Sequence, residues 1–107
     1  MRIELDLDAP STTQDVAVAA AFLITEIVEF AMLRHPEDSV EIQLRREGDL
    51  TATLAIASSV LVPEGDPSDI AKNQFERIVE GLARQLRSPL DRKLGRYVVT
   101  LPIFPDA

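Results

Sequence analysis

The chain has 107 residues, 46% of them hydrophobic, and a formal net charge of -7 at pH 7. This length suits one domain spanning residues 1–107, and the apolar fraction is enough for a real core. The chain lacks Cys, which excludes disulfides and thiol chemistry, and its single histidine, His35, argues against a structural zinc site. The negative charge argues against nucleic acid and anionic membranes as partners, because phosphate contacts need Lys and Arg.

No segment predicts membrane insertion or secretion. The longest apolar run, residues 16–24, is far shorter than the roughly 20 residues that a membrane helix needs. The N-terminal segment MRIELDLDAP lacks the charged, apolar and small-residue order of a secretory signal. We therefore expect a cytoplasmic protein.

The chain begins with a predicted strand. Ile3, Leu5 and Leu7 alternate with acidic residues, and Ala9–Pro10 follows them. Strict alternation of apolar and polar residues is typical of a strand that has one face on the core. We therefore expect a half-buried strand whose other face is acidic.

A long helix is predicted next, from about Thr12 to His35. Ser11 and Gln14 have the spacing of a capping box at its start. Pro36 ends it, because the residue before a proline is pushed away from helical geometry. Residues 16–24 are apolar nearly all round, so we expect that half of the helix to be deeply buried.

The middle of the chain predicts a hairpin and a loop. Alternating apolar positions predict a strand over Val40–Arg45, a turn at Glu47–Asp49 and a returning strand over Leu50–Ile56. Residues 58–69 contain prolines and a glycine and predict a loop. Its apolar piece, Val60–Val62, either belongs to a binding loop or folds down on the core, and the sequence leaves both readings open.

A second helix is predicted to start at residues 66–69. Asp66 suits the N-cap, Pro67 suits the first helical position, and Asp69 adds a second acid to the first turn. Ser88–Pro89 ends the helix. One face of this helix is apolar at helical spacing and is expected to be buried: Phe75, Ile78, Val79, Leu82 and Leu86.

The chain closes with predicted strands. A short one is expected near Leu90–Lys93, a turn at Gly95, and a last strand over Arg96–Phe104. The element order is strand, helix, strand, strand, helix, strand, strand. Two one-sided helices and alternating strands predict an α+β fold: a two-layer sandwich of one mixed β-sheet with both helices packed on one face.

Three segments carry a family resemblance. They are residues 23–32 (LITEIVEFAM), 78–86 (IVEGLARQL) and 95–102 (GRYVVTLP). In this order they resemble the Asn box, the helix after the second glycine box, and the last strand of the ATP-binding domain of sensor histidine kinases. The resemblance is to the HWE and HisKA_2 type, within the gyrase, Hsp90, histidine kinase and MutL (GHKL) superfamily, and it covers nearly the whole chain.

The sequence departs from this family where the nucleotide site should be. The resemblance puts Thr25 and Phe30 at the two asparagines of the Asn box, the second of which holds Mg²⁺, and a phenyl ring offers no oxygen to a hard cation. The first glycine box falls on residues 57–61, which hold neither its Asp nor its Gly, and Phe75 replaces a Gly of the second box. Glu26 keeps the family's acid. We expect no ATP, metal or cofactor, and Phe30 and Phe75 filling the former cavity.

Other candidate residues have two readings each. Glu26 is either a relict of the catalytic acid of related ATPases or an ordinary helix carboxylate. His35 is either a phospho-acceptor or a helix-end histidine favoured by the dipole. One basic cluster either docks an acidic partner or is a solvated helix end: Arg84, Arg87, Arg92, Lys93 and Arg96.

Three functional hypotheses follow. The resemblance implies bacterial two-component signalling, in which a domain without ATP would be a regulatory or protein-interaction module of a histidine phosphotransferase or a response-regulator phosphatase. Its partner would be a response regulator receiver domain or a helical dimerisation or phosphotransfer domain, and it would not be an enzyme on its own. The alternatives are a divergent but active ATP-binding kinase domain, supported by Glu26, and an unrelated small α/β binding module.

Overall fold

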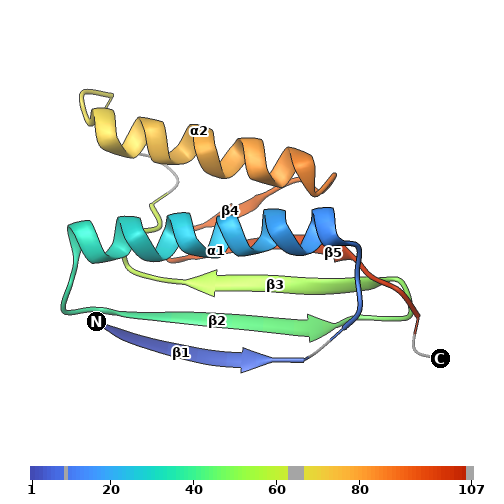
Figure 1. Ribbon diagram of the computed structural model, residues 1–107. Helices are drawn as coiled ribbons and strands as arrows, with labels where there is room; N and C mark the ends of the chain where they lie inside the picture. The colour runs from blue at the N-terminus through green and yellow to red at the C-terminus, as the bar shows by residue number, and fades with distance from the viewer. Residues whose placement is uncertain (9, 63–66, 106–107) are drawn as a thin grey trace.

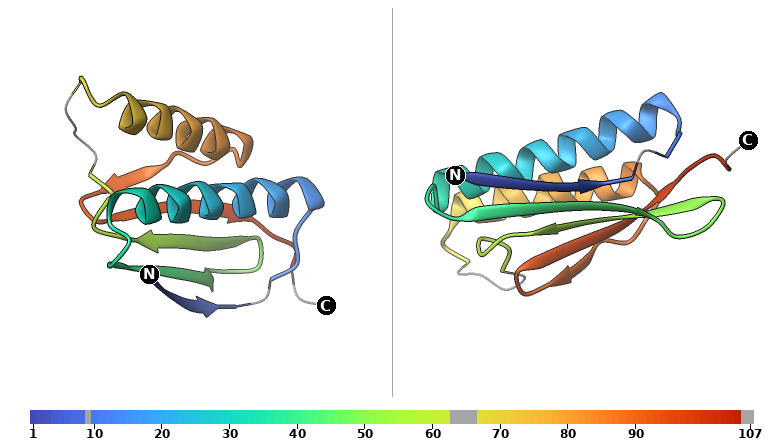
Figure 2. Two further views of the ribbon diagram at one scale, coloured as in Figure 1. Left: turned by 60° about the vertical axis from the view of Figure 1, so that its left-hand side comes forward. Right: turned by 90° about the horizontal axis from the view of Figure 1, so that it is seen from below.

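The computed structural model describes residues 1–8, 10–62 and 67–105, and in this part of the chain two helices lie on one face of a five-stranded sheet (Figures 1 and 2). The strands lie in the order β1-β2-β3-β5-β4, with β1 and β2 parallel and the other pairs antiparallel. The predicted α+β fold with a mixed sheet is confirmed. The elements are β1 (Arg2–Leu7), α1 (Gln14–Arg34), β2 (Ser39–Arg46), β3 (Thr51–Ala57), α2 (Ile70–Gln85), β4 (Asp91–Lys93) and β5 (Arg96–Pro102).

The core lies between the helices and the middle of the sheet. The register places Ile42 opposite Ile56 and Leu54 opposite Val99, so that alternate side chains of β2, β3 and β5 share the helix-facing side. From α1, Leu23 and Ile27 pack against them and are almost fully buried. The predicted turn between β2 and β3 is confirmed, and β5 ends two residues earlier than predicted.

The start of α1 differs from the prediction. Its N-cap is Thr13, whose hydroxyl accepts a hydrogen bond from the N–H of Val16 at 3.3 Å. Ser11, the predicted cap, lies two residues before Thr13, and its carbonyl accepts from the N–H of Phe104 at 2.7 Å. The predicted end is confirmed: the helix stops just before His35, which precedes Pro36.

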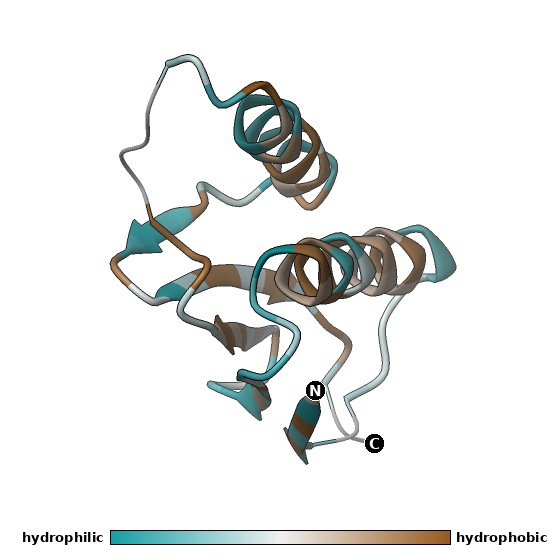
Figure 3. Cartoon of the chain, turned by 90° about the vertical axis from the view of Figure 1, so that its left-hand side faces the viewer, coloured by the Kyte–Doolittle hydropathy of each residue, from teal (hydrophilic) through white to brown (hydrophobic). Residues whose placement is uncertain are grey.

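The expectation that the first half of α1 is deeply buried was wrong. Val18 and Phe22 are 45% and 56% exposed. The sheet covers one face of α1 and α2 one flank, so an apolar residue on the remaining surface faces solvent (Figure 3). Apolar composition all round therefore did not indicate burial all round.

By length and composition, α1 is long and apolar enough to cross a membrane, and it is the one such helix in the described ranges. Its most apolar 18-residue window has a mean hydropathy of 2.1, so the whole helix passes a test that the run of residues 16–24 alone does not. The core helix of a soluble domain passes the same test, and 33% of this window is buried inside the fold. The finding is weak support for membrane insertion.

The prediction of a half-buried β1 was also wrong. Ile3, Leu5 and Leu7 are 47%, 62% and 52% exposed. The register with β2 places Leu5 beside Ile42, which keeps these side chains on the helix-facing side. They stay exposed because β1 is the outermost strand and α1 does not cover it.

The start of α2 is later than predicted. Asp69 is the N-cap and its carboxylate accepts from the N–H of Lys72, whereas Asp66, the predicted cap, lies outside the described residues. Phe75 and Val79 are buried as expected. Ile78 is 45% exposed, which corrects its placement on the buried face.

Candidate functional site

The four positions of the predicted nucleotide pocket do not meet in one place. Phe30 and Phe75 contact each other between α1 and α2. Glu26 lies beside them in a shallow groove on the outer side of the helix pair, where no hydrogen bond or ion pair engages its carboxylate among the described residues. Thr25 is exposed and donates to the carbonyl of Ala21 at 2.8 Å on its own helix. Of the four residues, only Phe30 and Phe75 lie where the resemblance puts the nucleotide cleft.

The two rings form a stacked pair that closes the space between the helices. Their centroids are 4.2 Å apart and their planes differ by 9°. Phe30 and Phe75 are 8% and 4% exposed. Each lies on the buried face of its own helix, three or four residues from another buried residue. Such a pair contributes about 0.5–1.5 kcal/mol beyond the burial of its area.

The N-terminus of α2 holds a carboxylate of the chain itself. Asp69 accepts from the N–H of Lys72 at 3.2 Å and forms an ion pair with Arg34 at the end of α1. The hydrogen bond from Arg34, followed by the one from the Lys72 N–H, lowers the pKa of Asp69. Arg34 also lies over the ring of Phe30, with Cζ 5.1 Å from the centroid. One carboxylate thus caps α2 and links it to α1.

A small cavity remains at this end of the helix pair. Its volume is about 240 Å³, and Phe30, Arg34, Asp69 and Lys72 contribute to its lining. His35 lines it too, and its backbone N–H donates to the carbonyl of Ala31 at 2.7 Å. The cavity lies between the α1 C-terminus, the α2 N-terminus and the segment after β3.

The apolar piece after β3, Val60–Val62, lies mostly against the core. Val60 and Leu61 are 5% and 0% exposed, so they fold down on the core, whereas Val62 is 36% exposed. Gly95 holds the segment, because its N–H donates to the carbonyl of Leu61 at 2.7 Å and its carbonyl accepts from the N–H of Ser58 at 3.0 Å. Gly95 has φ of 80°, a backbone conformation that favours glycine.

A polar network that the sequence analysis missed lies under α2. The Nζ of Lys72 donates to the carbonyl of Val62 and to Oε1 of Glu76, both at 2.6 Å. The hydroxyl of Tyr97 donates to the same Oε1 at 2.6 Å, and Arg92 donates to Oε2 at 2.8 Å. Glu76 therefore joins α2 to β4 and β5.

The charges in this network have clear electrostatic causes. Burial raises the pKa of Glu76, but hydrogen bonds from Lys72, Tyr97 and Arg92 outweigh it and lower the pKa overall. Burial and the neighbouring carboxylate both raise the pKa of Tyr97. The Lys72 side chain is only 9% exposed, so its ammonium depends on the acceptors it has. The spacing of Lys72 and Glu76 (i, i+4) was the one signal in the sequence.

The predicted basic cluster is divided by the fold. Arg92 forms ion pairs with Glu76 and Glu80, so its charge is held within the chain. Arg84 and Arg87 are exposed at the end of α2, and Lys93 has only a long contact of 3.8 Å with Asp91. Arg84 and Arg92 both line a shallow groove of about 330 Å³ beside Ser88–Leu90.

The arrangement offers little chemistry at the cleft. In the part of the chain that the structure describes, no group of three or more His, Cys, Asp or Glu side chains could hold a metal ion. A helix N-terminus with free N–H groups is a common anion site, but here the Asp69 carboxylate takes that position on α2.

The fold is similar to solved histidine kinase structures. The blue-light activated histidine kinase of Erythrobacter litoralis EL346 matches 95% of this chain with a TM-score of 0.73 and 17% identity, and the match covers 37% of that chain. The histidine kinase domain of the same protein matches 95% with a TM-score of 0.66 and 16% identity, covering 50% of that chain. The chain therefore spans half or less of the structures it matches.

No family model and no curated protein matches the sequence. At 16–17% identity, the structural likeness shows the fold alone. The three segments that resemble the Asn box, the second helix and the last strand fall on α1, α2 and β5. The chain has the fold of a histidine kinase domain.

Proposed function

We propose that this chain is a histidine-kinase-type ATPase domain that no longer binds ATP and acts in two-component signalling as a regulatory, protein-binding module. The observation that carries the proposal is the stacking of Phe30 on Phe75. The resemblance puts the Asn box and the second glycine box at these two residues. Two buried rings there replace an oxygen ligand and a phosphate-approaching backbone with apolar core.

The N-terminus of α2 supports the same proposal. Phosphate groups bind at helix N-termini because free N–H groups and the helix dipole attract negative charge. Asp69 already supplies that charge on α2, and Arg34, the cation nearest to it, is paired with it. A nucleotide phosphate would have to displace both contacts and would face the carboxylate's repulsion.

The proposed role is that of a domain within a histidine phosphotransferase or a response-regulator phosphatase. Its partner would be a response regulator receiver domain or a helical dimerisation or phosphotransfer domain, which fits a soluble, cytoplasmic protein. We assign Arg84, Arg87 and Lys93 as the cations that face an acidic partner, because they stay exposed. Arg92 instead positions β4 against α2 through its two carboxylates.

Isothermal titration calorimetry with Mg-ATP tests the proposal directly. We expect no saturable heat up to millimolar nucleotide, since the site lacks a magnesium ligand and a phosphate loop. A dissociation constant tighter than about 1 mM, equivalent to roughly -4 kcal/mol, would overturn the proposal. An active histidine kinase ATP-binding domain in the same buffer serves as the positive control.

A matched pair of variants tests whether the ring at position 30 alone prevents nucleotide binding. Phe30→Asn restores an oxygen ligand at the cleft, whereas Phe22→Asn makes the same change at a ring that is 56% exposed on the same helix. Both should remain without nucleotide binding, because Asp69 still caps α2. If Phe30→Asn alone binds Mg-ATP, the ring was the last barrier and the remaining site is still competent.

A further inference from the structure

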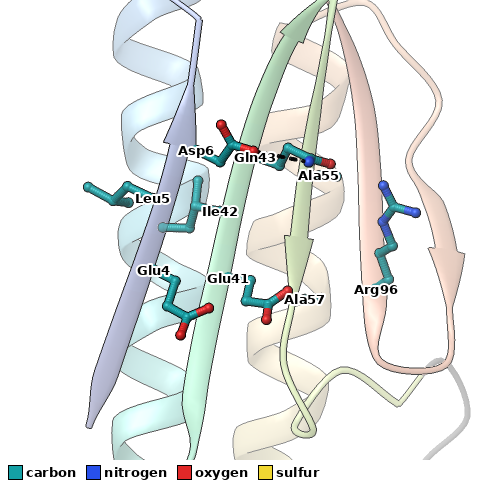
Figure 4. Close-up of a pocket in the computed structure, with 9 residues that line it drawn as sticks. All are labelled: Glu4, Leu5, Asp6, Glu41, Ile42, Gln43, Ala55, Ala57 and Arg96. Carbon is teal, nitrogen blue, oxygen red and sulfur yellow. Dashed lines mark hydrogen bonds between the residues drawn. The ribbon is translucent and has the colours of Figure 1, made fainter.

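The strand β1 is an open edge whose two faces carry different chemistry. It pairs with β2 alone, so alternate backbone N–H and C=O groups point away from the sheet. Ile3, Leu5 and Leu7 lie on its helix-facing side and are 47–62% exposed. In Figure 4, Leu5 extends outward beyond the edge of the sheet. Native proteins usually shorten, charge or cover such an edge; this one is charged on one face, but it is six residues long and neither helix covers it.

The flank of α1 above this edge is apolar too. Phe30 stacks on Phe75 and so marks the flank of α1 that faces α2. This flank lies toward β5 and β4. Ile24, Val28 and Met32 recur every four residues on the opposite flank, which lies toward β1. Ile24 and Val28 are only partly buried and Met32 is 53% exposed. Together with the apolar side of β1 they form what we call the β1 shelf.

The other face of β1 is acidic. Glu4 and Asp6 on β1 and Glu41 on β2 line a shallow groove of about 510 Å³ on the face of the sheet that has no helices (Figure 4). Gln43 donates to Asp6 at 3.5 Å across the same groove. Arg96 lies at its far side, on β5. The side of the groove nearest the open edge is therefore lined by carboxylates.

The four carboxylates on this face, those of Glu4, Asp6, Asp8 and Glu41, outnumber by one the nearby guanidinium groups of Arg2, Arg45 and Arg96. Arg45 pairs with both Asp6 and Asp8, and Arg2 pairs with Glu4 at 3.0 Å. Glu41 adds a further negative charge that no hydrogen bond or ion pair engages in the described residues. The open face of β1 and β2 thus keeps an excess of negative charge, as does the whole chain at -7.

We propose that the β1 edge binds an extended segment of a partner protein in which apolar residues alternate with Lys or Arg. The segment would add to the sheet as a strand beside β1, through main-chain hydrogen bonds. Its apolar side chains would cover the β1 shelf, and its cations would share Glu4 and Asp6 with Arg2 and Arg45. Strand alternation puts these two sets on opposite faces, which matches the two faces of β1.

A second copy of the chain fits this edge less well. A two-fold axis would pair β1 with β1 in antiparallel order. Registers centred on Glu4, Leu5, Asp6 or Leu7 set a carboxylate opposite a carboxylate on the acidic face. The register centred on Ile3 avoids this by setting Arg2 opposite Glu4, but it pairs only residues 1–5. Like charges directly opposite each other are destabilising in a sheet. A basic strand replaces each of these repulsions with an attraction.

This inference goes beyond the proposed function and does not depend on it. The β1 shelf and the stacked Phe30–Phe75 pair lie on opposite flanks of α1. Loss of nucleotide binding would leave β1 unchanged, and a covered β1 would leave the cleft unchanged. The two proposals can therefore fail separately.

Fluorescence anisotropy with labelled nine-residue peptides tests the proposal. The probe alternates Lys with Val and Ile, one control scrambles the same residues into blocks, and a second control replaces each Lys by Glu. We expect saturable binding of the alternating basic peptide alone, at least about tenfold tighter than either control. Amide shifts in an NMR titration should be largest in residues 2–7.

Substitutions in the full chain locate the site. Leu5→Asp should weaken binding of the alternating peptide by about tenfold or more, whereas Leu94→Asp, at a residue that is 79% exposed on the β4–β5 turn, should not change it. Circular dichroism confirms that both variants fold. Equal binding of the scrambled peptide, amide shifts confined to α1 and α2, or a concentration-dependent dimer abolished by Leu5→Asp would each overturn the proposal.

Discussion

The two edges of this sheet are built in opposite ways. At the β4–β5 edge, α2 lies over the strands and Glu76 joins the layers through Lys72, Tyr97 and Arg92. At the β1 edge neither helix buries the strand, and all six residues are exposed. The alternating sequence of β1 is as regular as that of β5. A strand's pattern therefore shows which side is apolar, while its neighbours decide whether that side is buried.

The contacts that stabilise the domain lie mainly on the side of α2. The stacked phenylalanines and the Glu76 network both hold α2, and both lie away from β1. We therefore expect substitutions under α2 to change the free energy of unfolding far more than substitutions on β1. Three measurements of urea-induced unfolding test this gradient.

The largest change in the free energy of unfolding is expected where α2 packs against α1. Phe75→Ala removes a ring that is 4% exposed and leaves Phe30 without its stacking partner. We expect a loss of about 3–5 kcal/mol in the free energy of unfolding, because truncation of a buried Phe leaves a cavity. Ile78→Ala, on the same helix but 45% exposed, should cost about 1 kcal/mol or less. Equal losses would mean that the stack does not hold the helix.

An intermediate effect is expected for the polar network. Glu76→Gln keeps the shape but removes the charge that faces Lys72 and Arg92. We expect a loss of about 2–3 kcal/mol, since a buried ammonium then lacks its counterion. Glu80→Gln breaks the outer ion pair of Arg92, at a side chain that is 43% exposed, and should cost less than about 1 kcal/mol.

The pH dependence gives the network an independent readout. The folded state lowers the pKa of Glu76 below its ordinary 4.5, so the folded protein binds fewer protons there than the unfolded chain. The resulting stability is present above pH 4.5 and is lost as the pH falls through the lowered value. Glu76→Gln should flatten this acid limb. An unchanged limb in the variant would place the titration elsewhere.

The smallest effect is expected on β1. Leu5→Ser changes a side chain that is 62% exposed and should alter the free energy of unfolding by about 0.5 kcal/mol or less. Ile42→Ser, beside it on β2 and 3% exposed, should cost more than about 2 kcal/mol. A loss above about 1 kcal/mol at Leu5 would show that β1 is covered in the isolated protein, and the contrast between the edges would fail.

Much of the fold could be predicted from local patterns. Alternation located the strands, Pro36 fixed the end of α1, and helical spacing put Phe75 and Val79 on the buried side of α2. These features depend on residues a few positions apart, where periodicity and backbone restrictions act directly. Two one-sided helices and alternating strands predicted the layer arrangement, and the solved histidine kinase structures share the fold.

The candidate site was harder to predict because its contacts join distant residues. Glu76 reaches Arg92 and Tyr97, which lie 16 and 21 positions away, and Arg34 reaches Asp69 over 35. No local pattern indicates which exposed-looking charge will meet which partner. The same reason explains why Arg92 looked like a docking residue. The caps are Thr13 and Asp69, which accept from the N–H groups of Val16 and Lys72, and the capping-box spacing of Ser11 and Gln14 did not indicate Thr13.

The Asp69 carboxylate competes with any other anion for the N-terminus of α2. A carboxylate joined covalently to the helix it caps acts as a tethered ligand, and its effective concentration at that site is in the millimolar range or above. Any free anion that approaches the N-terminus of α2 must compete with this carboxylate, which cannot diffuse away. Arg34 strengthens this competition, because its ion pair holds the Asp69 carboxylate in place. The domain carries its own competitive inhibitor of phosphate binding.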